Sequence, residues 1–319
     1  MSPISRVACV GTGVIGSSWA AAFAINGFQV ALYDIKDTFL AEAEKKIAAI
    51  FHSMETAGVL TPDAVSAARD RLSFTTDLTE AVGSAQFIQE NTPDRIELKQ
   101  SVLAQIEAAC APDTVIASST SNLLISKIAE RALHPERCVG GHPYNPPHLI
   151  PLVEVTRGPN TSDRALETAV AFYRACGKSP VVLQKESIGF ISNRLQMALY
   201  REAVDLVMRG VCSVEDVDTA VTYGPGLRWA SLGPNMIYQL GGGSGGLKGL
   251  LTALKEGGDA LIADLADWKE QPAEWIDIAQ AGVLREMEHF PDHIGHDNAQ
   301  IGVFRDKVLI ELLKLHQKL

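Results

Sequence analysis

A glycine-rich segment near the N-terminus constrains the fold more than any other feature of this sequence. It reads Val7-Ala-Cys-Val-Gly11-Thr-Gly13-Val-Ile-Gly16, a G-x-G-x-x-G spacing between an apolar strand pattern and a helical pattern. In that context Gly11 permits a tight turn, Gly13 lets the backbone approach a pyrophosphate, and Gly16 lets the helix pack against the strand. The amides at the helix N-terminus then face an anion. The segment predicts a dinucleotide-binding βαβ unit.

An acidic residue after the next predicted strand favours NAD as the dinucleotide. Asp34 follows the strand at 29–33, where a carboxylate accepts hydrogen bonds from the adenosine ribose and repels a 2′-phosphate. Alone, Asp34 would suggest a helix N-cap. Lys36 offers a cation that the extra phosphate of NADP could use. Strand, glycines and acid together predict an NAD site.

Hydrophobic periodicity divides the chain into two parts. Up to Lys185, short apolar runs alternate with helical patterns such as 38–57 and 96–110, which is typical of a parallel sheet. A long amphipathic pattern from Phe190 to Arg209 then opens a helical region. We expect an α/β fold, with a Rossmann-type, mostly parallel sheet domain at 1–187 followed by an all-helical domain at 188–319. The strands are expected at 6–10, 29–33, 72–75, 86–90, 114–117, 138–141, 153–155 and 180–183.

Composition narrows the kind of partner. The formal charge of -10 disfavours nucleic acid and anionic membranes, so a small molecule is the expected partner. The five cysteines are scattered singly, which argues against a disulfide framework or a zinc site. His293 and His296 have no neighbouring ligands, and we expect no metal. The apolar stretch 14–28 is too short to span a bilayer and has no basic flank, so we expect a cytoplasmic protein.

A glycine-rich segment lies within the predicted helical region. The stretch Leu240–Gly249 holds six glycines without a preceding strand, so we expect a flexible turn between helices.

The segment from His142 to Glu154 is a rigid connection with several prolines that joins two apolar runs. Oxidation of an alcohol needs a base for the hydroxyl proton, and imidazole is well matched near neutrality. A strand glutamate is costly to bury unpaired, so Glu154 is expected to orient His142.

Each residue of this pair also has an ordinary structural interpretation. A single histidine is usually a satisfied core residue, and a strand glutamate can simply face water. Two polar segments offer further contacts to a substrate oxygen, through Ser121 in 117–122 and Asn193 in the first helix of the second domain. Here too alternatives stand, because serines commonly cap helices and an Asn–Arg pair commonly lies on a solvated face.

Several motifs in one order carry a family resemblance. They are Gly-Thr-Gly-Val-Ile-Gly, Ser-Ser-Thr-Ser, His-Pro-Tyr-Asn-Pro-Pro, Pro-Leu-Val-Glu-Val and Gly-Phe-Ile-Ser-Asn-Arg-Leu. With them the chain resembles the 3-hydroxyacyl-CoA dehydrogenase superfamily, most closely its lambda-crystallin or L-gulonate 3-dehydrogenase branch. The resemblance covers nearly the whole chain. It implies a Rossmann-type domain, a helical dimerisation domain and a homodimer.

The resemblance also implies roles for individual residues. It makes His142 and Glu154 the catalytic dyad and puts Ser121 and Asn193 at the family's serine and asparagine positions. It implies cofactor contacts at five further positions in addition to the three glycines: Val14, Ile15, Asp34, Glu90 and Arg95.

One departure from the acyl-CoA members bears on the substrate. The chain carries Gly224-Pro-Gly-Leu-Arg228-Trp229 where those members resemble one another in an uncharged sequence. A guanidinium can bind a free carboxylate through two hydrogen bonds, so Arg228 favours a free hydroxy acid, although it can also be a surface arginine beside a turn. We expect NAD-dependent oxidation of the 3-hydroxyl of a small, L-gulonate-like acid.

Three alternatives stay open. A short-chain (S)-3-hydroxyacyl-CoA dehydrogenase would use the same dyad. L-Carnitine dehydrogenase would add a quaternary ammonium, which calls for aromatic faces such as Tyr144 or Trp229. A crystallin-like structural protein would need no turnover, but it gives no reason to keep His142, Glu154, Ser121 and Asn193 together.

Overall fold

The computed structural model describes residues 4–319, which divide into two compact units. The first unit runs to Arg194 and includes Lys318 and Leu319, and the second covers Leu195–Gln317. The boundary that we propose from the sequence, 187/188, lies seven residues earlier. The structure assigns 188–194 to the first unit, and this segment bonds to Glu154 and Ser121 of that unit, as described below.

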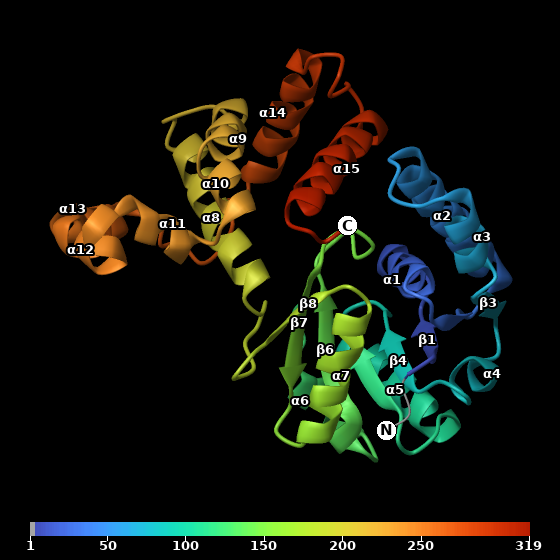
Figure 1. The fold of residues 1–319 in the computed structure, drawn as a ribbon. Coiled ribbons are helices and arrows are strands. Elements are labelled where there is room, and N and C mark those ends of the chain that lie inside the picture. The colour runs from blue at the N-terminus through green and yellow to red at the C-terminus, as the bar shows by residue number, and fades with distance from the viewer. Residues whose placement is uncertain (1–3) are drawn as a thin grey trace. The chain divides into compact units, whose positions relative to one another are not determined.

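The first unit is built on one eight-stranded sheet (Figure 1). The strand order is β3-β2-β1-β4-β5-β6-β7-β8, and every neighbouring pair is parallel except β6 and β7. A mostly parallel sheet was expected from the alternating pattern, and it is confirmed. The strands are β1 (Arg6–Val10), β2 (Gln29–Tyr33), β3 (Leu72–Thr75), β4 (Phe87–Glu90), β5 (Val115–Ser118), β6 (Cys138–Pro143), β7 (Leu152–Arg157) and β8 (Ser179–Val182).

Helices cover both faces of the sheet, because its strands are apolar on both sides. One face packs against α1 (Val14–Ile25), α2 (Asp37–Thr56), α3 (Pro62–Arg69) and α7 (Asp163–Ala175). The other packs against α4 (Leu78–Val82), α5 (Ile96–Ala109) and α6 (Ile125–Ile128). The first core is rich in aromatic contacts, such as the stacked pair Trp19 and Phe23 at 4.9 Å. These two cores fix the strand ends that carry the site.

The sheet order creates a place for a ligand. Strand order reverses between β1 and β4, and open α/β sheets bind ligands at the carboxyl ends of strands beside such a reversal. Backbone bonds join these ends, since Asn91 N donates to Val10 O at 2.7 Å and Ser119 N donates to Glu90 O at 2.8 Å. The loops after β1, β4 and β5 therefore form one connected edge.

The second unit is helical. Its elements are the rest of α8 (Ser192–Met208), α9 (Val214–Tyr223), α10 (Pro225–Ser231), α11 (Pro234–Gly241), α12 (Gly246–Ala253), α13 (Lys255–Asp264), α14 (Trp275–His289) and α15 (Asn298–Leu315). The glycine-rich stretch is more ordered than we expected: Gly241 ends α11, a 3-10 turn spans Gly243–Gly245, and Gly246 and Gly249 belong to α12. The turn that we expected over the whole stretch is confined to residues 242–245, because the residues on either side belong to α11 and α12; Gly246 has a φ of 57°, a conformation that favours glycine.

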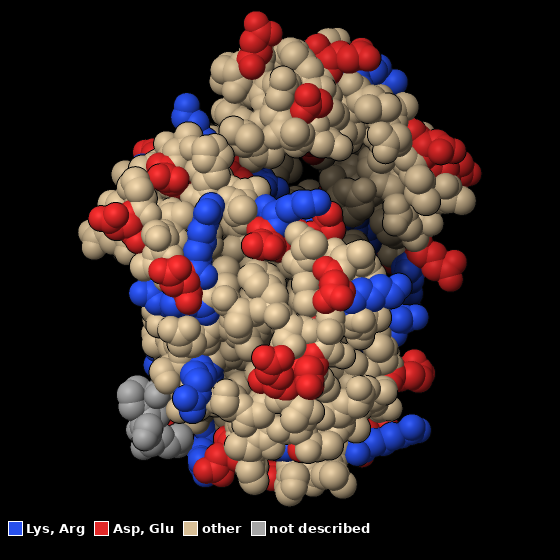
Figure 2. Space-filling model, turned by 90° about the vertical axis from the view of Figure 1, so that its right-hand side faces the viewer, with Lys and Arg blue, Asp and Glu red and all other residues tan. Residues whose placement is uncertain are grey.

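The structure shows how charged side chains are distributed on one face and how apolar the helices are. On the face shown in Figure 2, acidic and basic side chains are interspersed, so that face carries no continuous basic patch. Among residues 4–319, no helix has the length and apolar character needed to cross a membrane.

Candidate active site

The glycine loop takes the shape that its sequence predicts. Gly11 has a φ of 88°, a conformation that favours glycine, and its N–H donates to Tyr33 O at 2.9 Å. A Cβ on Gly16 would lie 1.9 Å from Gly11 O, so only glycine lets α1 start this close to the turn. The loop therefore passes directly from β1 into the N-terminus of α1.

The start of α1 fits the diphosphate of a dinucleotide. The first helical bond is made by Ser17 N to Gly13 O at 3.0 Å, so the amides of Val14, Ile15 and Gly16 precede the helical ladder. A Cβ at Gly13 would meet no atom within 4 Å, so the residue that precedes these donors borders open space. Helix N-termini of this kind bind phosphate groups. The predicted residues Gly13, Val14 and Ile15 thus lie at the N-terminus of α1.

Asp34 lies at the end of β2 beside the glycine loop. Its Oδ2 accepts hydrogen bonds from Thr12 N at 2.8 Å and Thr12 Oγ1 at 2.9 Å, and its Oδ1 accepts one from Ile35 N at 2.8 Å. These three bonds fix the carboxylate at the same edge as Gly11. A carboxylate has about four acceptor positions, so Asp34 keeps capacity for a ribose hydroxyl.

His142 and Glu154 form a buried pair across the antiparallel strands β6 and β7. They are direct register partners, and His142 Nδ1 lies 2.9 Å from Glu154 Oε2. Both side chains are almost fully buried. Because an ionised carboxylate only accepts, Nδ1 carries the proton and Nε2 is left as the basic nitrogen. The arrangement is an oriented base.

Glu154 is held by the start of α8 as well as by His142. Its Oε1 accepts hydrogen bonds from Ile191 N at 2.7 Å and Ser192 N at 2.9 Å, and its Oε2 accepts one from Ser192 Oγ at 2.6 Å. Burial raises the pKa of Glu154, but the bonds from His142, Ser192 and Ile191 outweigh it and lower the pKa to about 2. The carboxylate therefore stays ionised behind the imidazole at neutral pH.

Two residues of this site were not predicted. The sequence predicts no role for Ser192, yet its amide and hydroxyl both donate to Glu154. Phe190 is buried with a φ of 51°, which is rare for a bulky residue, and its ring centroid lies 5.1 Å from that of His142. The available signal was Gly189 before Phe190, because glycine is the residue that most readily adopts a positive φ, and Gly189 has a φ of 73°.

Ser121 and Asn193 are brought together within the first unit. Asn193 Nδ2 donates to Ser121 O at 3.4 Å, and Asp94 Oδ2 accepts a hydrogen bond from Ser121 N at 2.8 Å. Ser121 follows β5 and Asn193 lies in the first turn of α8, next to the residues that bind Glu154. Their side chains are half-buried, as expected for groups that can reach a substrate.

The carboxylate of Glu90 is engaged by neighbouring side chains and backbone of the first unit. Its carboxylate is buried and accepts hydrogen bonds from Thr92 N at 2.6 Å, from Thr92 Oγ1, from Ser118 Oγ at 2.6 Å and from Lys99 Nζ. These donors occupy the acceptor positions of both oxygens. Its side chain therefore fixes the loop after β4, while the exposed Arg95 lies at the end of that loop as the N-cap of α5.

Arg228 belongs to the second unit. It is exposed on α10, next to the half-exposed ring of Trp229. Within the described part of the chain, residues 4–319, no three His, Cys, Asp or Glu side chains gather in a way that could hold a metal. His296 instead bonds to Met287 O and Asp292.

Comparison with family models covers most of the chain. A model described as 3-hydroxyacyl-CoA dehydrogenase, NAD binding domain, matches residues 6–187. A second, described as 3-hydroxyacyl-CoA dehydrogenase, C-terminal domain, matches residues 189–282. The two models meet between β8 and α8.

Individual relatives agree with these models. An L-carnitine dehydrogenase of Streptomyces griseus subsp. griseus is 41% identical over 98% of this chain and 90% of its own length. One of Bacillus cereus is 37% identical over 99% of this chain and 93% of its own length. Among solved structures, a 5-formyl-3-hydroxy-2-methylpyridine 4-carboxylic acid 5-dehydrogenase, described as an NAD+ dependent dismutase, has a TM-score of 0.81 and 31% identity, with 99% of this chain and 98% of that chain covered.

Proposed function

The chain belongs to the 3-hydroxyacyl-CoA dehydrogenase family and is an NAD-dependent oxidoreductase acting on a CH–OH group, and we propose that its substrate is L-carnitine. The observation that carries the chemistry is the 2.9 Å contact between His142 and an ionised Glu154. The observation that favours the substrate is the similarity to L-carnitine dehydrogenases over almost the full chain.

In this proposal His142 is the general base. Its Nε2 takes the proton of the 3-hydroxyl as the C3–H bond breaks and the C3 carbonyl forms. Bound NAD+ supplies the hydride acceptor. Glu154 stabilises the imidazolium that results, since the buried carboxylate lies against Nδ1. In the reverse direction the same imidazolium returns the proton.

Ser121 and Asn193 are the proposed contacts to the substrate oxygen. A hydroxyl and an amide can donate to the oxygen as it gains carbonyl character, which orients C3 for hydride transfer. The contact between Asn193 and Ser121 O supports a common task for the two residues. Phe190 covers His142 with an apolar ring and excludes water from one side of the base.

The two ends of L-carnitine call for different groups. Its carboxylate suits Arg228, and its quaternary ammonium suits an aromatic face such as that of Trp229 or Tyr144. Arg228 was first assigned to an L-gulonate-like acid. That finer expectation finds no support among the relatives, whereas L-carnitine, one of our alternatives, does. Arg228 serves either acid, so the correction concerns the substrate and not the residue.

Competition between substrates tests the proposal. Catalytic efficiency, kcat/KM, is measured with NAD and L-carnitine, L-gulonate or (S)-3-hydroxybutyryl-CoA. We expect L-carnitine to give the highest value. A higher value for the CoA ester would mean that the substrate is a thioester and not a free acid. The thioester is the second candidate because solved relatives are described as 3-hydroxybutyryl-CoA dehydrogenases. No turnover with any of them would rule out all three substrates for this oxidoreductase.

A homodimer formed through the second unit is also proposed. Large apolar side chains such as Leu195, Met197 and Ile276 are exposed in this unit. Burial of such a patch is the usual basis of a symmetric dimer. Sedimentation should therefore give a species of twice the chain mass, and a stable monomer at micromolar concentration would contradict the proposal.

A further inference from the structure

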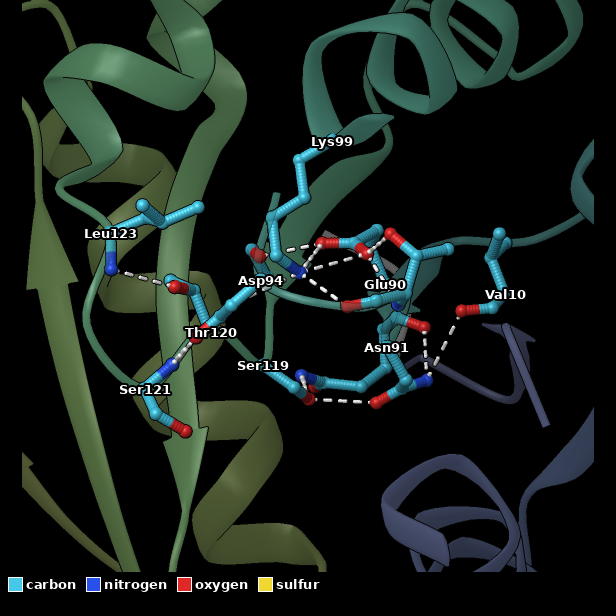
Figure 3. A network of polar contacts seen from close by, with 12 residues as sticks. Val10, Glu90, Asn91, Asp94, Lys99, Ser119, Thr120, Ser121 and Leu123 are labelled. Carbon is cyan, nitrogen blue, oxygen red and sulfur yellow. Dashed lines mark hydrogen bonds and ion pairs between the residues drawn. The ribbon is translucent and has the colours of Figure 1, made fainter. Parts of the chain in front are cut away.

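A buried ion pair lies beneath the loop after β4 (Figure 3). The Lys99 side chain reaches from α5 and is 1% exposed. Its Nζ lies 2.9 Å and 3.0 Å from the two oxygens of Glu90, and it donates to Thr92 O at 2.9 Å. A lysine this buried is tolerated only when its charge and its donors are matched. The pair therefore fixes both the end of β4 and the start of the loop.

Asp94 extends this charge cluster to the loop after β5. Its Oδ1 lies 3.6 Å from Lys99 Nζ, and its Oδ2 accepts a hydrogen bond from Ser121 N at 2.8 Å. Figure 3 shows Asp94 between the lysine and the loop that carries Ser121. One carboxylate thus connects a buried cation to the backbone of Ser121.

Ser121 is consequently held from two sides. Asp94 accepts from its amide, and the Asn193 side chain donates to its carbonyl oxygen. The next turn is fixed by Thr120 Oγ1, which accepts a hydrogen bond from Leu123 N at 2.9 Å. Small displacements of a group that contacts substrate reduce the rate strongly, so such supports matter for catalysis.

We propose that Asp94 is a positioning residue for Ser121, and that the buried Lys99–Glu90 ion pair holds Asp94 in place. The proposal rests on the proposed contact of Ser121 with the substrate oxygen. It also gives Glu90 a task that differs from the expected cofactor contact, since its carboxylate is occupied by Lys99, Thr92 and Ser118.

Substitution of Lys99 alone is a poor test, because it would leave Glu90 as an unpaired buried charge and could unfold the chain. Asp94 is partly exposed, so Asp94→Ala should fold. Two readouts follow the same variant: amide hydrogen exchange of the peptide that contains Ser121, measured by mass spectrometry without substrate, and steady-state kinetics. Asp113→Ala is the matched control, since Asp113 is exposed on the same unit and forms a surface ion pair with Arg164.

We expect Asp94→Ala to accelerate exchange at Ser121 and to lower kcat about tenfold, with little change in KM for NAD. Asp94→Asn keeps an oxygen acceptor for the Ser121 amide and should recover part of both effects. In a Ser121→Ala background the Asp94 substitution should add little, because both act through one side chain. Asp113→Ala should change neither readout.

Two results would overturn the proposal. Unchanged exchange at Ser121 would show that Asp94 does not hold its amide, and a full tenfold loss on top of Ser121→Ala would show that Asp94 acts elsewhere. The paired variant Lys99→Met with Glu90→Gln removes both buried charges; if exchange at Ser121 is unchanged there, Lys99 has no part in the support. The exchange readout needs no substrate, so it stands even if L-carnitine is not oxidised, and the two proposals can fail separately.

Discussion

The two units differ in how far they bury their apolar side chains. In the first unit, large side chains such as Trp19, Phe23 and Tyr173 are fully enclosed between the sheet and its helices. In the second unit, few apolar side chains are buried, Val204 and Trp275 among them, while Ile262 and Ile276 are each 69% exposed. The first unit therefore fixes its own polar site, whereas the second has apolar surface that a further partner can cover.

In our proposal the chemistry and the specificity belong to different units. The proposed base, its carboxylate and the proposed oxygen contacts all lie within residues up to Arg194. Arg228 lies in the second unit. We therefore expect substitution of His142, Glu154 or Ser121 to impair the reaction with every substrate, and substitution of Arg228 to impair it selectively.

The largest effect is expected at the base. His142→Gln should lower kcat by about 10²–10⁴-fold, because general-base catalysis is lost. NAD affinity, measured by fluorescence titration, should be nearly unchanged, since the glycine loop is intact. His52→Gln, an exposed position on α2, is the control. Turnover close to that of the wild type in the His142 variant would rule out the mechanism.

Glu154 should affect stability as well as turnover. Its folded-state pKa of about 2 lies below its ordinary value of 4.5, so the carboxylate stabilises the fold above about pH 4.5 and loses this effect as pH falls through about 2. Glu154→Gln should lower the free energy of unfolding by about 3 kcal/mol near neutral pH.

Denaturant unfolding of both proteins across pH measures this difference, which should shrink as the solution becomes acidic. Glu167→Gln on α7, where the side chain is exposed, should show no such pH dependence. A gap between wild type and Glu154→Gln that is constant with pH would mean that the variant fails for reasons of packing and not of charge.

Arg228 tests the specificity assigned to the second unit. Arg228→Met should reduce kcat/KM for L-carnitine by about 2 kcal/mol, roughly thirtyfold, through loss of a charge-assisted contact to the carboxylate. An uncharged carboxyl ester should be used as well as before. Arg285→Met, exposed on α14, is the matched control. Equal losses with acid and ester would make Arg228 a structural residue and weaken the contrast between the units.

The smallest expected effect concerns the choice of dinucleotide. Asp34→Ser should lower the preference for NAD over NADP, expressed as a ratio of kcat/KM values, by about tenfold, because it removes the charge that opposes a 2′-phosphate. Serine keeps an oxygen for the Thr12 amide. Asp37→Ser, in the first turn of α2, controls for the general loss of a negative charge. A preference unaltered by Asp34→Ser would place NAD selection elsewhere.

Local patterns were enough to predict the framework of the first unit. The apolar runs at β1, β2 and β3 match the expected strands to the residue, and α8 begins two residues after the amphipathic pattern does. Strand periodicity and the glycine spacing are properties of neighbouring residues, so the sequence displays them directly. The candidate base and its carboxylate could be named because a rigid segment joins them.

Contacts between distant segments needed the tertiary structure. Glu154 accepts a hydrogen bond from Ile191, which lies 37 residues further along the chain at the start of α8. Ser121 donates to Asp94, which lies 27 residues before it. Nothing in the sequence near Lys99 reveals that it lies beneath Glu90, because α5 can present any of its faces to the sheet until the whole core is packed. In the glycine-rich stretch, the expected turn is confined to residues 242–245, because the residues on either side belong to α11 and α12.

The sequence by itself determined the class of cofactor site, the order of strands and helices along the chain, and the pair of residues suited to move a proton. The tertiary structure decided which donors surround that pair, that Glu90 faces a lysine, and which side chains hold Ser121. Backbone periodicity is encoded locally, whereas hydrogen bonds between segments depend on how the sheet and its helices pack. Acidity and positioning at the site follow from those long-range contacts.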